Sequence, residues 1–132
     1  MMCSVVSVPA FAADETQIVT DLVAPAYEYA MSTESYLTIT SSSAECKSIC
    51  EGMPGVTKIT VEQTLEKYWG LWIWNTVDGA SWSKTVYSDA TRLSSTKSGL
   101  DSGTYRLKSV FTLTSSDGKS ETIMVYSEEK TI

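Results

Sequence analysis

The chain has 132 residues, with ten basic and sixteen acidic side chains and a formal net charge of −6. This length allows one domain with a proper hydrophobic core and is too short for two, and the acidic charge argues against nucleic acid and anionic membranes as partners. The chain has no histidine, which removes the usual general base and zinc ligand. We therefore expect no catalytic triad, no metal site and no cofactor.

The first twelve residues are small and apolar and end in Ala10-Phe11-Ala12, the A-x-A pattern of a signal-peptidase site. We expect a signal peptide over residues 1–12 that is truncated at its start, since a basic region is missing; a buried N-terminal strand is the alternative. No later segment has the roughly 18 apolar residues that a membrane span needs. The sequence thus predicts a secreted protein, released or held at the cell surface by partners.

Residues 13–34 are acidic and mixed, and we expect a solvated leader in which a short edge strand can begin after Pro25. Residues 35–132 form the predicted folded domain. β-branched residues recur there in short runs and helix-period segments are scarce, so the predicted class is all-β.

Alternating apolar residues between turn signals predict a series of short strands. They cover residues 36–40, 44–51, 56–67, 71–76, 82–87, 92–97, 105–114 and 121–127. Hairpins or turns are expected at Trp69-Gly70, at Asp78-Gly79 and at residues 116–119. Seven or eight strands at this spacing predict an immunoglobulin-like Greek-key β-sandwich, with an eight-stranded barrel as the alternative.

The strand over residues 56–67 alternates most clearly. Its inward set is Ile59, Val61, Gln63 and Leu65, and its outward set is Lys58, Thr60, Glu62, Thr64 and Glu66. Such alternation is typical of an antiparallel sheet with one face toward water.

The stretch over residues 100–113 contains a turn followed by a central strand. Asp101-Ser102-Gly103 makes the turn, with Gly103 free to adopt positive φ. Tyr105 follows at the start of the strand, the position of a tyrosine corner, in which the phenol hydrogen-bonds to backbone upstream. Leu107, Ser109, Phe111 and Leu113 share its face.

This stretch resembles the D-x-G-x-Y-x-C signature of immunoglobulin and fibronectin type III sandwiches, with Leu107 where antibody domains have a cysteine. A second resemblance is to a family of small secreted proteins of unknown function from Gram-positive (Firmicutes), mostly gut-dwelling, bacteria. It is carried by AECKSICEG (44–52), GVTKI (55–59), GTYR (103–106), DGK (117–119) and ET (121–122). Both resemblances imply an exported sandwich domain, and neither implies catalytic residues. Leu107 leaves Cys46 without a cross-sheet disulfide partner.

Cys46 and Cys50 lie on one face of a predicted strand. Four extended residues span about 13 Å, too far for a disulfide between them, so we expect two buried thiols. A disulfide enabled by a break in the strand, and intermolecular or redox chemistry, are the alternatives.

Four tryptophans and a tyrosine are concentrated between residues 68 and 82. They are Tyr68, Trp69, Trp72, Trp74 and Trp82. Such rings can form a stacking platform for sugar or a hot spot for a protein partner, or they can fill the core. We expect at least one or two of them to be buried.

The charged residues that could form a functional site fall into three sets. Arg106, Lys108 and Lys119 are expected on a solvated strand face. Asp78, Asp89, Asp101 and Asp117 fall in predicted turns, without the spacing of a calcium loop. A glycosidase would need two opposed carboxylates among Glu62, Glu66 and Asp78.

The sequence favours a secreted, non-enzymatic binding or adhesion module that contacts a glycan or a surface protein through the Trp-rich strand pair and adjoining loops. The alternative is a structural protein that assembles through its edge strands.

Overall fold

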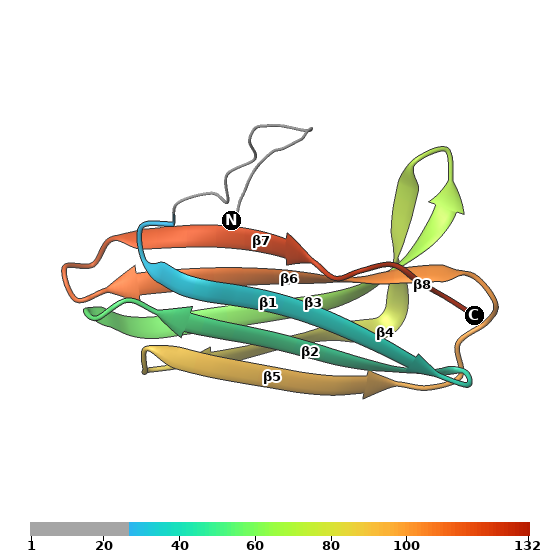
Figure 1. The fold of residues 1–132 in the computed structure, drawn as a ribbon, viewed down its shortest axis with the longest axis horizontal. Helices are drawn as coiled ribbons and strands as arrows, with labels where there is room; N and C mark the ends of the chain where they lie inside the picture. Colours follow the sequence, from blue (N-terminus) through green and yellow to red (C-terminus); the bar gives the residue numbers. More distant parts are fainter. Residues whose placement is uncertain (1–26) are drawn as a thin grey trace, which may run out of the picture.

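A computed structural model describes residues 27–132 of the chain. The predicted signal peptide and most of the predicted leader lie outside these residues. The described part is all-β, with two antiparallel sheets packed as a β-sandwich (Figure 1), which confirms the predicted class and excludes the barrel. Within residues 27–132, no helix is long and apolar enough to cross a membrane.

Eight strands form the two sheets. They are β1 (Ala30–Thr40), β2 (Ser43–Gly52), β3 (Val56–Gly70), β4 (Ile73–Val86), β5 (Ala90–Lys97), β6 (Thr104–Ser115), β7 (Ser120–Tyr126) and the short β8 (Lys130–Thr131). One sheet has the order β1-β2-β5 and the other β4-β3-β6-β7, and β8 pairs with β6. The connections β2–β3, β4–β5 and β5–β6 therefore pass from one sheet to the other.

Three strand boundaries differ by more than two residues from the predicted ones. β3 continues to Gly70, through the turn predicted at Trp69-Gly70, because Gly70 still pairs with Ile73 of β4. β1 begins at Ala30, six residues before the predicted start, because its polar residues still pair in register with β2 from Ser32 onward. β4 continues through Asp78-Gly79, where the sequence predicts a turn. The Asp-Gly pair forms a bulge there, and Gly79 takes a φ of 73°.

The bulge in β4 is large. Thr64 pairs with Ser81 and Glu66 with Thr76, so Leu65 of β3 faces the four residues from Val77 to Ala80. Ala80 is fully buried and Val77 packs beside it against Leu65, at one end of the core. Bulges bend and twist a strand pair, and beyond this one the β3–β4 hairpin projects away from the sandwich (Figure 1).

Central strands β3 and β6 supply most of the core. The inward residues of β3 are buried as the alternation predicts, and so are all five of β6, from Tyr105 to Leu113. Residues 58–67 of β3 pair with residues 105–114 of β6, so the two apolar rows lie side by side. Fully burying each such side chain contributes on the order of 1.5–3 kcal/mol before entropy is considered.

A belt of polar side chains divides this core. Ser48, Gln63 and Ser109 lie at the middle of β2, β3 and β6 and are almost completely buried. The Ser48 and Ser109 hydroxyls are hydrogen-bonded at 2.6 Å, and Gln63 Nε2 donates to Ser48 Oγ at 2.8 Å and to the Leu93 carbonyl at 2.9 Å. One apolar cluster, with Phe111, lies on one side of the belt, and the other, with Tyr105, lies on the other side.

The Tyr105 ring is 1% exposed, and its hydroxyl donates to the Asp101 carbonyl at 2.7 Å. This is the hydrogen bond that the sequence predicts. Gly103, in the same turn, has a φ of 154°, and a Cβ there would lie 2.5 Å from Cε of Lys67. The turn and the start of β6 are thereby held against the core.

Replacing Tyr105 with phenylalanine should lower the free energy of unfolding by about 1–2 kcal/mol, because the Asp101 carbonyl loses its donor while the ring stays buried. Urea unfolding followed by tryptophan fluorescence measures the change. Tyr36→Phe removes an exposed phenol, whose partner is the Glu34 carboxylate, and serves as the control. Equal stability of the two variants would contradict a structural role for the Tyr105 hydroxyl.

Candidate functional site

Residues 68–74 form the end of the β3–β4 hairpin, and most of their apolar side chains are exposed. We call residues 69–73 the hairpin tip. Trp69 is 65% exposed, Leu71 77% and Trp72 89%, and Ile73 is also exposed. The tip stands clear of the sandwich (Figure 1), in agreement with the exposure of these side chains.

A two-residue turn closes the hairpin. Gly70 pairs with Ile73, and the intervening Leu71 and Trp72 have φ values of 54° and 66°. Two positive φ values are those of a type I′ turn, which favours Asn-Gly because bulky side chains are strained there. The Trp72 N–H donates to the Tyr68 hydroxyl at 3.2 Å. The turn therefore holds two large apolar residues in a backbone conformation that they disfavour.

Tyr68 and Trp74 lie directly below the tip. They face each other across the hairpin, and their rings pack at a tilt with centroids 5.2 Å apart. Both side chains point to the outer face of the five-stranded sheet. Trp74 is half-buried, so this pair is the stem on which the tip stands.

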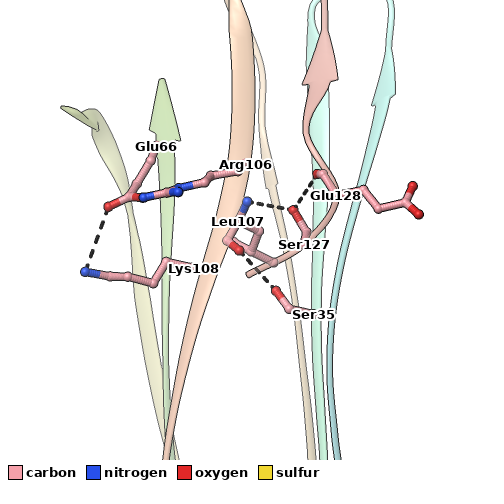
Figure 2. A network of polar contacts seen from close by, with 7 residues as sticks. All are labelled: Ser35, Glu66, Arg106, Leu107, Lys108, Ser127 and Glu128. Carbon is pink, nitrogen blue, oxygen red and sulfur yellow. Dashed lines mark hydrogen bonds and ion pairs between the residues drawn. The ribbon is translucent and has the colours of Figure 1, made fainter. Parts of the chain in front are cut away.

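An arginine joins the stem to the sandwich. The Arg106 guanidinium carbon lies 4.2 Å from the Trp74 ring centroid and 4.0 Å from that of Tyr126, so it stacks against both rings. Arg106 Nε donates to Glu66 Oε1 at 2.8 Å, and Lys108 Nζ lies 3.8 Å from Glu66 Oε2 (Figure 2). The result is a row of contacts across β4, β3, β6 and β7.

These contacts correct two predictions. Glu66 points outward as expected, but it is only 7% exposed, because the cation pair and the neighbouring side chains cover it. Arg106 is likewise part of a packed stack, not of a solvated strip. Lys119 lies in the turn before β7, at the far end of the strand that pairs with β6, so it does not join Arg106.

A hollow lies at the base of the hairpin. It has a volume of about 340 Å³, and its lining includes Lys67, Asn75, Asp78, Lys97, Asp101 and Tyr105. Two lysines balance two aspartates in this lining. A second hollow, of about 440 Å³, lies over the outer face of β1, β2 and β5 and is lined mainly by short polar side chains with Tyr36 and Ile49. Among residues 27–132, no three acidic, cysteine or histidine side chains gather as a metal site would require.

The structure brings four of the five predicted aromatic residues together. Tyr68, Trp69, Trp72 and Trp74 belong to the projecting hairpin, whereas Trp82 lies beyond the bulge, half-buried against the core. None of the four tryptophans is fully buried, contrary to the expectation. Sequence reasoning missed Leu71 and Ile73 as tip residues, although the hairpin is apolar on both faces, and it missed Tyr126, which reaches Arg106 from a distant strand.

Cys46 and Cys50 are free thiols, 1% and 0% exposed. Burial raises the pKa of Cys46 to about 12 and, with the nearby Glu51 carboxylate, that of Cys50 to about 11. Thiolates are the reactive form, so both residues act as small apolar core side chains.

Both thiols should resist alkylation by iodoacetamide at pH 8.5 in the native protein and react in urea. The fold favours the neutral thiol, so its contribution to stability is complete below the ordinary pKa of 9.0 and is lost as the pH rises toward 11 to 12. Mass spectrometry counts the labelled cysteines. Labelling in the native state at the unfolded rate would contradict their burial.

Arg106→Lys should destabilise the hairpin stem by about 1 kcal/mol, because an ammonium keeps the charge but cannot stack flat on Trp74 and Tyr126. Faster amide exchange at residues 66–76, measured by NMR, would report the loosened stem. Lys108→Arg is the control at the neighbouring outward position. Unchanged exchange in both variants would show that Arg106 does not hold the stem.

Comparison with known proteins gives no family: no protein-family model and no curated protein matches this chain. The hairpin and its stem are therefore the basis for assigning a function.

Proposed function

We propose that this protein is a secreted, non-enzymatic binding or adhesion module that contacts its partner through the hairpin tip. The observation that carries the proposal is the tip turn, where Leu71 and Trp72 are held at positive φ and exposed. Strained backbone of this kind costs on the order of 1–3 kcal/mol per residue and is found mostly at functional sites.

Packing in the rest of the fold does not require Leu71 and Trp72 at these two positions. Leu71 and Trp72 contribute nothing to either apolar cluster of the core, and an Asn-Gly turn would close the same hairpin with less strain. Exposed, contiguous apolar side chains mark contact surfaces. Aromatic residues are also enriched among the anchors that dominate binding energy.

The stem supports the same function. Arg106, Glu66 and Tyr126 tie Trp74 to the body of the sandwich, so the tip is presented on an anchored base. A contact site that is ordered before binding loses less conformational entropy on association.

The non-enzymatic part of the proposal is supported by the placement of the three carboxylates that a glycosidase would need. Glu66 is neutralised by Arg106 and Lys108, Glu62 is exposed on the sheet face, and Asp78 lies at the bulge. A general acid and a base must face each other across a substrate, and neither Glu62 nor Glu66 lines the hollow that contains Asp78.

Secretion rests on the predicted signal peptide, and the immunoglobulin-like Greek-key assignment and the Gram-positive family rest on sequence resemblance. Assembly through edge strands has less support than binding through the tip. Of the two edges with the longest strands, β4 is interrupted by the bulge at residues 77–80 and β1 has a register shift at its start, between Ala30 and Ser32. Bulges blunt edges against pairing.

The paired substitution Leu71→Asn with Trp72→Gly tests the proposal. It should stabilise the hairpin locally by about 1–3 kcal/mol, because the new residues suit positive φ, and it should abolish binding. Amide exchange of residues 66–76 gives the first quantity. Binding is measured on glycan arrays, purified peptidoglycan and lipid vesicles.

Tyr87→Asn is the matched control, since it removes an 81% exposed aromatic side chain that follows β4, at the opposite end of that strand from the tip. It should leave binding unchanged. Binding that survives the paired substitution, or a wild-type chain that binds none of these probes, would refute a contact function for the tip.

A further inference from the structure

We propose that the hairpin tip inserts into the interfacial layer of a zwitterionic lipid bilayer. This inference rests on the proposed function, since it names the partner of the same site. It goes beyond that function because a lipid surface is recognised by different chemistry from a glycan or a protein.

The composition of the tip is the first argument. No charged residue occurs from Tyr68 to Val77, a run of ten residues, and the outermost side chains are Trp69, Leu71 and Trp72. Tryptophan and tyrosine prefer the boundary between lipid headgroups and acyl chains, because their rings are apolar and their polar atoms stay wet. Leu71 and Ile73 add purely apolar area.

The backbone of the hairpin is the second argument. The strand pairing reaches Gly70 and Ile73, with a register shift between Tyr68 and Gly70 that leaves Trp69 unpaired in the ladder, and the Trp72 N–H donates to the Tyr68 hydroxyl. An unpaired backbone group in an apolar environment costs several kcal/mol. A hairpin end closed by strand pairing leaves fewer backbone groups unpaired than an open loop of the same length, and so it avoids part of that cost.

Charge complementarity is the third argument. The base of the hairpin carries four cations, Lys67, Lys97, Arg106 and Lys108, and three carboxylates, Glu66, Asp78 and Asp101. These groups leave one positive charge, whereas residues 27–132 together have ten basic and thirteen acidic side chains. The excess of acidic side chains within the described residues therefore lies away from the base of the hairpin. A zwitterionic surface matches an uncharged tip on a nearly neutral base, and a strongly anionic bilayer would repel the remainder of the chain.

The composition and shape of the hairpin argue against a sugar or a protein as the partner of the tip. A sugar is oriented by several converging polar side chains, and the tip provides none between residues 69 and 73. A specific protein interface usually needs about 800 Å² on each partner with a polar rim. A two-stranded end that projects from the sandwich (Figure 1) suits insertion better than it suits a flat interface.

The test uses the full chain and large vesicles of phosphatidylcholine. Cosedimentation gives the partition coefficient, and acyl chains brominated at known depths quench tryptophans that enter the bilayer. The wild-type chain should bind, with quenching strongest for shallow bromines. The paired substitution Leu71→Asn with Trp72→Gly should lower the partition coefficient by at least about tenfold, because a Leu and a Trp side chain no longer leave water.

Tyr87→Asn should partition as the wild type does. All variants carry the same first 26 residues, so a contribution of the apolar residues 1–12 is identical in each. Exchanging part of the phosphatidylcholine for phosphatidylglycerol should weaken binding or leave it unchanged.

Two results would overturn the inference: absence of partition to phosphatidylcholine, or partition that the paired substitution leaves intact. If the tip variant instead loses binding to a glycan or to peptidoglycan and the wild type ignores vesicles, the lipid assignment is wrong and the contact function stands. If no probe shows tip-dependent binding, both are wrong.

Discussion

Pairing between β3 and β6 is the constraint on which the other features depend. Their register sets Leu65 beside Leu107 and Val61 beside Phe111 on the inner face, and the same register sets Glu66 beside Arg106 on the outer face. Because strand side chains alternate with a period of two, a slip of one residue would bury the ion pair and expose the core. The core and the hairpin stem are thus fixed by one ladder.

The polar belt strengthens that register. Gln63 and Ser109 are paired residues on β3 and β6, and both reach Ser48 of the opposite sheet directly. A shifted register would leave these buried groups without partners, at a cost of about 1–3 kcal/mol each. A purely apolar core would lose no hydrogen bonds if the strands paired in a shifted register. The belt therefore contributes to specificity of strand pairing as well as to stability.

Much of this architecture could be predicted from the sequence. The alternation in residues 56–67 and 105–114 identified the buried face of both central strands, and the Asp-Ser-Gly turn before Tyr105 identified the corner. These signals are formed by residues that are adjacent in sequence, so they can be recognised without knowledge of the tertiary contacts. The bulge at residues 77–80 was not predicted, since Asp78-Gly79 suits a turn and a bulge equally well and only the burial of Ala80 decides between them.

The candidate site was predicted in composition but not in arrangement. The aromatic run identified the hairpin, yet the separation of Trp82 from the others depends on the bulge. The stack of Trp74, Arg106 and Tyr126 joins residues from three strands that are far apart in sequence, and no local pattern encodes such a contact. The turn at Leu71-Trp72 was missed because Trp69-Gly70 is the more ordinary turn pair.

The bulge in β4 also separates what the hairpin does from what the core requires. Residues 80–86 of β4 pack within the sandwich, while residues 69–73 of the tip are joined to it through the Tyr68–Trp74 stem. Substitutions at the tip are consequently released from the selection that governs folding. The same sandwich can serve as a scaffold for other tips, and this tip is a segment that an engineer could graft onto an unrelated two-stranded stem.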